Sequence, residues 1–454
     1  MKIVKVYTNI VDFNTIVDCQ IDRGINEHGH AMIKGWIDDG QDILKQISDI
    51  TFANIYGVTD EGKTLTLFAG IIENVAQKAV LGAVECSISL IGTTKLMDMD
   101  VITKPYQNLA VTYLDIAEKL GKKYQAIIND QVGIMQPING FIQQYRETDW
   151  DFLLRILSHR NAYVVPLCLE NKIYINIGID KQIQILKADL MDYSMEKELC
   201  VQGDRQEGTL QNVLKIKSRD FFELGDCIEG FSGSAMYITQ ATSRYEGSEL
   251  VHYYELKDFA GIRTEKQTNK KLIGASLDAT VSSISKDKVK VRISADESSV
   301  TNWFLYSSVY SSPDGTGWYC MPEMGDRVRV YFPSEDETQA YVISAVHLDT
   351  SSQLRTNPDN KIIMNKYMKQ IEFTPTTLKI TNGIGMSILI DDEEGIKIES
   401  DKNITFVAAQ NFEMLSLTDK VEIAAESQVN LKQNNASINL QDDIVVSGSQ
   451  MHIQ

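Results

Sequence analysis

The sequence predicts a mainly β fold with a small α+β part. Three observations support this prediction. Short alternating segments separated by Gly, Asp and Asn fill most of the 454 residues. Helical spacing of apolar residues is clear in only two stretches, both within the first 160 residues. The last quarter of the chain carries an apolar repeat of about eight residues, which is typical of β-solenoids and intertwined β-helices.

Composition excludes several classes of function. The formal net charge is -18, and we find no cluster of Lys and Arg of the kind that nucleic-acid binding requires. The N-terminal run MKIVKVYTNIVDFN loses its apolar character too early for a signal peptide, and no stretch of about 18 apolar residues follows. The six cysteines form no C-x-x-C pair, so we interpret them as small buried side chains in a reducing cytoplasm. We therefore expect a protein that is cytoplasmic during assembly.

Residues 1–268 are predicted to form one β-rich domain with an α/β insert at about 105–185. Alternating segments at 50–58 and 85–92 indicate strands. A first amphipathic helix is expected over residues 109–120, closed by Gly121. Thr148 is placed as the N-cap of a second helix, with Asp151 three residues later. The strand pattern then resumes at 161–166 and 172–177.

Residues 269–350 are predicted to form an OB-fold domain. The segment 289–293 alternates cleanly, and a Gly325-Asp326 turn precedes a strand bounded by Pro333. Three aromatic residues of this domain are interpreted as core residues, not as a stacking platform for bases: Trp303, Tyr306 and Trp318. A linker at 351–364 follows.

The C-terminal residues 365–454 are predicted to form a trimeric, intertwined β-helical spike. Apolar residues two positions apart recur about every eight residues, and eight residues are too few to close a coil from one chain. Three chains winding together would close it, with the paired residues on a shared axis. The predicted axial residues are Ile388, Ile390, Ile396, Ile398, Ile404, Phe406, Val421, Ile423, Val429, Leu431, Ile438 and Leu440. The alternative is a single-chain solenoid with irregular coils.

No catalytic, cofactor-binding or metal-binding residue is predicted. His28 and His30 could supply two metal ligands from one strand face, but we interpret them as turn and strand-entry residues. The segment from Gly230 to Ser234 lacks the G-x-S-x-G spacing of a nucleophile elbow. Asp149 and Asp151 have the spacing of carboxylates that stabilise a helix start, where free N–H groups attract them.

Several motifs occur in the order found in one known family. They are Tyr145-Arg146-Glu147-Thr148-Asp149-Trp150-Asp151-Phe152-Leu153, Leu224-Gly225-Asp226 with Met236-Tyr237-Ile238-Thr239 and Tyr253-Tyr254-Glu255-Leu256, and Gly317-Trp318, Met321-Pro322 and Gly325-Asp326-Arg327-Val328. With the octad repeat, the chain resembles the fused hub–spike proteins of contractile injection systems: the type VI secretion spike (VgrG) and the phage late control protein D hub. It departs from some relatives in two ways, because large apolar residues fill both places of each repeat pair and no lysozyme domain separates barrel from spike.

This resemblance implies a homotrimeric structural protein without enzymatic activity or cofactors. Each chain would contribute two related β-barrels to a ring of six, joining a tube to a baseplate, and the spike would puncture a target envelope. Implied partners are tube and baseplate proteins and a possible PAAR-type tip protein, with no nucleic acid. The particle, whether phage, bacteriocin-like or secretion system, would be extracellular after release or firing.

Two alternatives accompany this hypothesis. A β-helical polysaccharide-degrading enzyme would need a groove of paired acids and aromatics, and a receptor-binding tail protein would normally end in a globular tip. At the chain's end, His452 invites comparison with spikes that hold an ion through tip histidines. If Met451 and Ile453 face the axis, strand alternation turns His452 outward, so we expect no tip metal.

Overall fold

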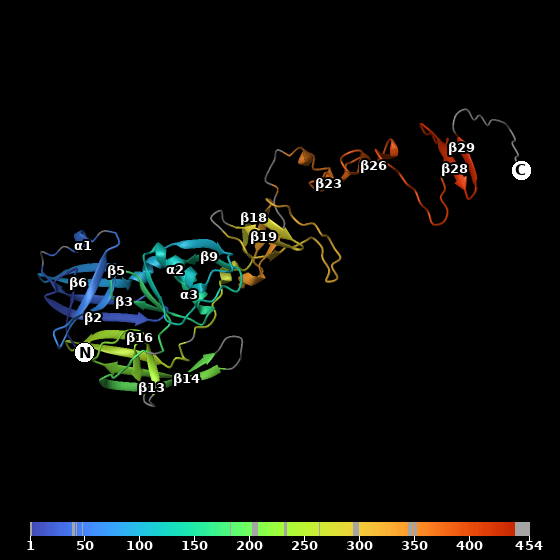
Figure 1. Cartoon of the computed structure of the whole chain (residues 1–454). Coiled ribbons are helices and arrows are strands. Elements are labelled where there is room, and N and C mark those ends of the chain that lie inside the picture. Colours follow the sequence, from blue (N-terminus) through green and yellow to red (C-terminus); the bar gives the residue numbers. More distant parts are fainter. Residues whose placement is uncertain are drawn as a thin grey trace. The chain divides into compact units, whose positions relative to one another are not determined.

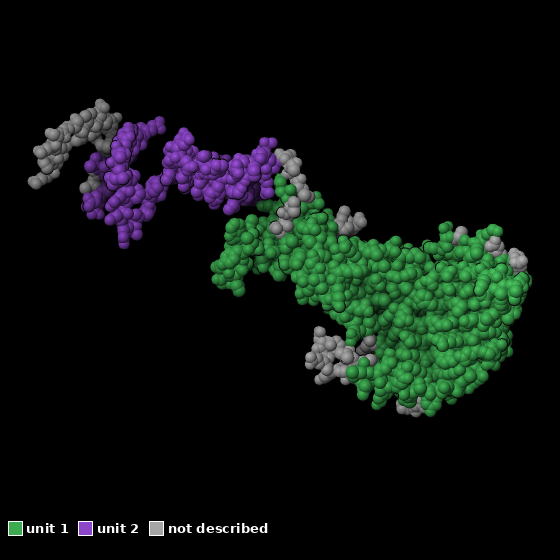
Figure 2. Space-filling model, turned by 180° about the vertical axis from the view of Figure 1, so that it is seen from behind, with its two compact units in different colours: residues 1–347 green, residues 348–454 purple. Residues whose placement is uncertain are grey.

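The structure is a computed structural model that describes residues 2–38, 41, 43–47, 49–181, 183–201, 208–230, 234–262, 264–293, 299–343, 347 and 352–440. The chain divides into two compact units, residues 1–347 and 348–454 (Figure 2). Strands dominate both units, which confirms the mainly β class. No helix among the described residues is long and apolar enough to cross a membrane.

Two β-barrel lobes share one continuous sheet in the first unit (Figure 1). The first lobe contains β1 (Ile3–Thr8), β4 (Phe52–Thr59), β5 (Thr64–Val80), β6 (Ala83–Gly92), β3 (His30–Ile37) and β2 (Thr15–Gly24), in this order across the sheet. The second lobe continues with β16 (Ala235–Glu246), β17 (Glu249–Lys257), β14 (Gly208–Ser218) and β13 (Leu190–Val201), and β15 (Cys227–Glu229) and β12 (Ile185–Leu186) extend from β16. Each lobe has its own buried apolar core, and the antiparallel pairing of β2 with β16 joins them.

A small α/β insert interrupts the two lobes. Its elements are β7 (Val101–Tyr106), α2 (Tyr113–Lys123), β8 (Ile127–Asp130), β9 (Ile142–Thr148), α3 (Asp149–Ser158), β10 (Val164–Leu167) and β11 (Tyr174–Ile177), and short helices α1 (Ile43–Gln46) and η1 (Thr93–Asp98) precede it. As predicted, Thr148 caps α3, because its hydroxyl accepts from the Asp151 N–H at 3.1 Å. Helix α2 starts later than expected, at a capping box that Thr112 and Asp115 form.

The OB-like sheet of the first unit has the strand order β20-β19-β18-β21-β22. Its strands are β18 (Ser276–Ser285), β19 (Lys288–Arg292), β20 (Phe304–Leu305), β21 (Arg327–Tyr331) and β22 (Tyr341–Ile343), with short helices η2 (Lys270–Leu272) and η3 (Glu337–Gln339). The prediction of core aromatics is wrong for Trp303 and Trp318, which are 39% and 56% exposed. Trp303 lies beneath the Lys290 ammonium, 4.8 Å from the ring centroid, instead of inside the barrel.

The α/β insert and the OB-like sheet share a core. Phe141 precedes β9 in the insert, yet it is buried among the OB residues, 5.2 Å from the Phe304 ring centroid and 6.0 Å from that of Phe332. A hydrogen bond also joins the two parts, since the Gln107 side-chain amide donates to the Val291 main-chain carbonyl at 3.0 Å. The two parts therefore pack as one body.

A buried ionic network crosses the same boundary. The Arg155 guanidinium of α3 donates to both carboxylate oxygens of Glu147, at 2.7 and 2.9 Å, and to Glu337 of η3 at 2.6 Å. It also donates to the Gln143 carbonyl at 2.9 Å. The side chains of Arg155, Glu147 and Glu337 are all at least nine-tenths buried. Burial is the main cause of the raised pKa of Glu147, and the Arg155 charge opposes that rise.

In the second unit, five strands form an antiparallel meander: β23 (Lys361–Met364), β24 (Gln370–Phe373), β25 (Thr377–Thr381), β26 (Met386–Asp391) and β27 (Gly395–Ser400). A hairpin of β28 (Val429–Gln433) and β29 (Ala436–Leu440) follows after a gap, and a short helix η4 (Gln353–Arg355) precedes the meander. Strand β23 occupies the end of the segment that we predicted to be a linker. The domain boundaries stay predictions.

We predict that replacing Arg155 with Met destabilises the first unit by about 3–5 kcal/mol, because two buried carboxylates lose the cation that both of them bind. The triple variant that adds Glu147→Gln and Glu337→Gln removes these charges and should recover most of the loss. Urea unfolding of the full chain, followed by tryptophan fluorescence, measures both changes. The exposed Lys215–Glu196 pair offers a control, and Lys215→Met should leave the unfolding midpoint unchanged. Equal midpoints for the wild type and Arg155→Met would contradict a structural role for this network.

Candidate functional site: an apolar ladder on the C-terminal sheet

The five-stranded meander aligns its isoleucines in a row across the strands. Ile363 pairs with Ile371, Ile371 with Ile380, Ile380 with Ile388, and Ile388 with Ile398. Directly opposed side chains in an antiparallel sheet lie on the same face. One face of the meander therefore carries an unbroken row of five isoleucines.

A second row runs beside the first. It joins Phe373, Leu378, Ile390 and Ile396 by direct cross-strand pairing. These residues lie two positions from members of the first row, so both rows share one face. We call the nine residues of the two rows the apolar ladder.

The opposite face of the meander is largely polar. Its central row joins Glu372, Lys379, Leu389 and Lys397, and Lys397 also forms an ion pair with Glu399 at 2.7 Å. The sheet is thus amphipathic, with its apolar side on the ladder face. A face of this composition normally packs against another layer.

No described part of the chain covers the apolar ladder. Eight of its nine side chains are exposed, from 36% at Ile371 to 72% at Ile396, and Leu378 is half-buried. Full burial of an Ile side chain contributes roughly 1.5–3 kcal/mol, so the uncovered ladder forgoes a large part of the stability that it could supply. A continuous apolar patch of this kind marks an interaction surface.

Between the meander and the β28–β29 hairpin, the described chain has no backbone pairing. Residues 402–428 make no backbone-to-backbone hydrogen bond with another described residue. Bends at 401–402, 409–410, 417–419 and 426–427 separate stretches of six residues, and these carry the pairs Ile404/Phe406, Phe412/Met414 and Val421/Ile423. Backbone N–H and C=O groups require partners when they are buried. If this segment is buried in an assembly, other chains must supply those partners.

The structure brings some predicted axial residues together in pairs. Ile388 opposes Ile398, Ile390 opposes Ile396, and Leu431 opposes Ile438 in the β28–β29 hairpin. Ile404, Phe406, Val421 and Ile423 are exposed and lie in the segment that is unpaired among the described residues, and Val429 is half-buried opposite the backbone of Leu440. The Leu440 side chain and residues 441–454, His452 included, lie outside the described residues. The shared axis stays a prediction.

The first half of the ladder was not predicted from the sequence. The predicted repeat begins at Ile388, whereas the pairs Ile371/Phe373 and Leu378/Ile380 have the same spacing and the same role. These earlier pairs follow one another at intervals of seven and ten residues, which hides the eight-residue period. The two-apart spacing alone would have found them.

The candidate metal ligands do not form a site. His28 Nδ1 lies 2.8 Å from the Thr94 hydroxyl, its Nε2 lies 3.5 Å from an Asp98 oxygen, and its ring packs 4.5 Å from that of Trp150. Burial lowers the pKa of His28 to about 4. His30 is exposed on β3. Among the described residues, no group of three His, Cys, Asp or Glu side chains is arranged to hold a metal.

Asp149 is a structural carboxylate. Burial would raise its pKa, but hydrogen bonds from Gln144 at 2.9 Å, Tyr124 at 2.7 Å and Lys123 at 2.9 Å outweigh that effect and lower it. Asp151 is exposed in the first turn of α3. Gly230 and Ser234 flank residues 231–233, which lie outside the described part of the chain, so the structure does not describe that segment.

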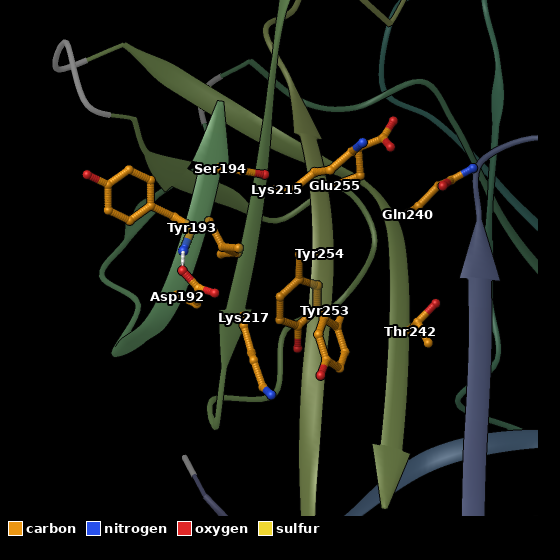
Figure 3. Close-up of a pocket in the computed structure, with 11 residues that line it drawn as sticks. Asp192, Tyr193, Ser194, Lys215, Lys217, Gln240, Thr242, Tyr253, Tyr254 and Glu255 are labelled. Carbon is orange, nitrogen blue, oxygen red and sulfur yellow. Dashed lines mark hydrogen bonds between the residues drawn. The ribbon is translucent and has the colours of Figure 1, made fainter. Parts of the chain in front are cut away.

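A cavity of about 300 Å³ lies on the polar face of the second lobe (Figure 3). Cross-strand pairing places Asp192, Lys217, Tyr253 and Thr242 in one row along its floor. The two lysines that line the cavity form ion pairs with neighbouring carboxylates: Lys217 with Glu246 at 3.0 Å and Lys215 with Glu196 at 2.7 Å. Charge-paired side chains on a sheet face explain this surface without a reactive group.

The comparisons with known proteins agree with this architecture. Residues 277–347 match the family model described as the type VI secretion system/phage-baseplate injector OB domain. The structure is similar to the Escherichia coli c3393 protein, described as a component of the type VI secretion system with structural similarity to T4 bacteriophage tail proteins gp27 and gp5. That match has a TM-score of 0.53 and 14% identity, and covers 74% of this chain and 99% of that chain. The Francisella PdpA-VgrG complex in its half-lidded form matches with a TM-score of 0.56 and 11% identity, and 87% of each chain is covered.

No curated protein sequence matches the chain. The two structural matches nevertheless cover 74% and 87% of this chain. They confirm the resemblance to hub–spike proteins at the level of the fold.

We predict that Ile388→Asp disrupts self-association of the second unit, because it places a carboxylate in the middle of the apolar ladder. Leu389→Asp is the matched control. It makes the same aliphatic-to-acid change on the adjacent residue of β26, but on the opposite face, between Lys379 and Lys397. Analytical ultracentrifugation should show a loss of oligomer for Ile388→Asp only. Equal behaviour of the two variants would show that the ladder face is not an interface.

Proposed function

We propose that this chain is the structural hub and central spike of a contractile, phage-tail-like injection machine. In this role it joins the tube to the baseplate and punctures the target cell envelope. The apolar ladder, together with the unpaired segment 402–428 that follows it, is the observation that carries the proposal, because both features are suited to pairing with other copies of the chain. The OB family match and the fold of the first unit support the same assignment.

The assembly proposed is a homotrimer. Three copies of an amphipathic meander can enclose a common apolar interior with their ladder faces, as sheets do when they pack face to face. After the meander in the sequence, three copies of residues 402–428 can exchange backbone hydrogen bonds. In each copy these residues have backbone N–H and C=O groups that are not paired with another described backbone group. The predicted axial residues would then lie against one another along the spike.

The first unit is proposed to form the hub. Two barrel lobes per chain give six lobes in a trimer, which suits a tube built from rings of six. The similar Francisella structure is a complex of PdpA with VgrG, and we propose that this chain likewise carries a partner protein, in addition to tube and baseplate proteins and a PAAR-type tip protein. It would assemble in the cytoplasm and reach the exterior with the particle.

We infer that the protein is not an enzyme. Asp149 is held by hydrogen bonds from Gln144, Tyr124 and Lys123, and the lysines that line the cavity on the second lobe form ion pairs with carboxylates. The alternatives are a β-helical polysaccharide-degrading protein and a receptor-binding tail protein. Both would release or bind a sugar substrate, which separates them experimentally from a spike.

The purified full chain should be a trimer by native mass spectrometry and should release no sugar from peptidoglycan or capsular polysaccharide. The chain with Ile388→Asp should lose the trimer while its first unit stays folded. A monomeric wild-type chain would overturn the spike assignment. Reducing sugars released by the wild type, but not by a heat-denatured sample, would favour the enzyme instead.

A second prediction concerns nucleic acid, because the OB-like sheet carries exposed aromatics. Arg292 and Arg327 both lie opposite Thr280 in the sheet, which gives a small cationic strip. The sequence alone did not predict this strip. We still expect no submicromolar binding of single-stranded DNA at physiological salt, because so few phosphate contacts give only weak electrostatic affinity. Fluorescence anisotropy tests this, and Trp303→Ala identifies any binding that occurs by base stacking.

A further inference from the structure

A leucine stands at the tip of the longest hairpin of the first lobe. Strands β5 and β6 pair up to Val80 and Ala83, so Leu81 and Gly82 form a two-residue turn. Both have positive φ, 51° at Leu81 and 86° at Gly82. Such turns favour Asn-Gly or Asp-Gly, because a branched apolar side chain is strained in the left-handed region.

The Leu81 side chain is not stabilised by burial against its own chain. Its side chain is fully exposed, at 104% of the reference value. The residues beside it, Ala79, Val80, Ala83 and Val84, are small and uncharged. We call residues 79–84 the apolar knob. A strained and exposed apolar tip has no role in the stability of the hairpin, which points to a contact with another molecule.

The second lobe contains a cavity of suitable chemistry. It has a volume of about 290 Å³ and lies between β14 and the β12–β15 pair. Its apolar lining consists of Leu186, Ala188, Leu190, Leu214, Ile216 and Ile228. Among the described residues, β12 and β13 pair with β15 and β14 and not with each other, so the cavity marks the seam where this barrel stays open.

The floor of this cavity is the core of the lobe. Leu214, Ile216 and Ile228 are each 3% exposed, whereas Leu190 at the mouth is 40% exposed. Lys187 and Glu229 also line it, one cation and one anion. We call this cavity the seam socket. An aliphatic side chain entering it would contact the core directly and displace water from apolar walls.

We propose that the apolar knob of one copy inserts into the seam socket of the next copy. Knob and socket are different surfaces of the same chain, so the contact is head-to-tail and closes into a ring when its rotation matches the number of copies. This inference rests on the proposed function, which supplies three copies held together by their second units. The ring then alternates first and second lobes.

The surfaces support a second copy as the occupant. The knob has Lys78 opposite Glu85 at its base, and the socket carries Lys187 and Glu229, so neither surface has a net charge that would repel the other. A lipid surface is disfavoured, because a single leucine buries too little area and the chain carries a net charge of -18. The short apolar tip matches a socket of about 290 Å³.

Disulfide trapping in the full chain tests the contact. The variant combines Leu81→Cys and Ala188→Cys with Cys320→Ser, which removes an exposed thiol. Mild oxidation should produce covalent dimers and trimers on a non-reducing gel. Glu61→Cys with Ala188→Cys is the control, because Glu61 is exposed at the β4–β5 turn of the same lobe, at the opposite end of β5 from Leu81, and it should stay uncrosslinked. Leu81→Cys alone should also stay uncrosslinked.

The outcomes separate this inference from the proposed function. A native trimer with no Leu81–Ala188 crosslink would overturn the knob-and-socket contact and leave the spike assignment intact. A monomeric chain would overturn the spike assignment itself. Crosslinking of the Glu61 control to the same extent would show collision of mobile copies and would equally refute the contact.

A second variant distinguishes docking from folding. Leu81→Asn should raise or preserve the melting temperature, because Asn tolerates the left-handed conformation, and it should also abolish the contact. Hydrogen exchange of backbone amides measures the contact, because the amides of β12 and β15 around the socket should lose protection in the Leu81→Asn trimer. Unchanged protection there, with an intact trimer, would rule the proposal out.

Discussion

The Arg155 guanidinium joins parts of the first unit that lie far apart in the sequence. It binds Glu147 eight residues away and Glu337 at a sequence distance of 182, and all three side chains are buried. A buried charge of this kind is tolerated only when every donor has a partner, so the network fixes the positions of α3, β9 and η3 together. Phe141 adds an aromatic side chain from the insert to the core of the OB-like sheet. The joint is therefore specified by charge and by packing, and it can bear load without a hinge.

The second unit is stabilised in the opposite way. It has no buried core among its described residues, and the apolar ladder lies exposed on one face of the meander. Its described backbone pairing is interrupted over residues 402–428 and resumes only in the β28–β29 hairpin. In the proposed assembly, the first unit brings its own stability and the second unit obtains it from other copies. A protein that must withstand an axial force would benefit from this division, since backbone hydrogen bonds shared by three chains must break together.

Local signals were readable from the sequence, and distant contacts were not. The cap of α3 followed from Thr148 and Asp151, and the spike pairs followed from a spacing of two residues. The partner of Arg155 could not be found, because nothing near Glu337 distinguishes it from a surface glutamate before the chain folds. The same limit applies to Phe141, which leaves its own insert to enter the neighbouring core. The prediction for Trp303 and Trp318 was wrong for a related reason. Large aromatic side chains are usually buried, and only the tertiary structure shows that these two are exposed.

Turn chemistry explains where pairing within the chain gives way to unpaired repeats. Four of the five hairpins in the described part of the second unit contain a residue with positive φ: Met368, Gly383 with Gly385, Gly395 and Asn434. Between 401 and 428 no residue has positive φ, and the sequence contains no glycine from 396 to 447. Tight antiparallel hairpins favour such residues, and this stretch keeps the apolar pairs of the repeat without the positive-φ turns that fold most of the meander back on itself. Turns with positive φ thus accompany four of the five hairpins in the described part of the second unit, and the segment 401–428, which lacks them, is the part that we propose to pair between chains.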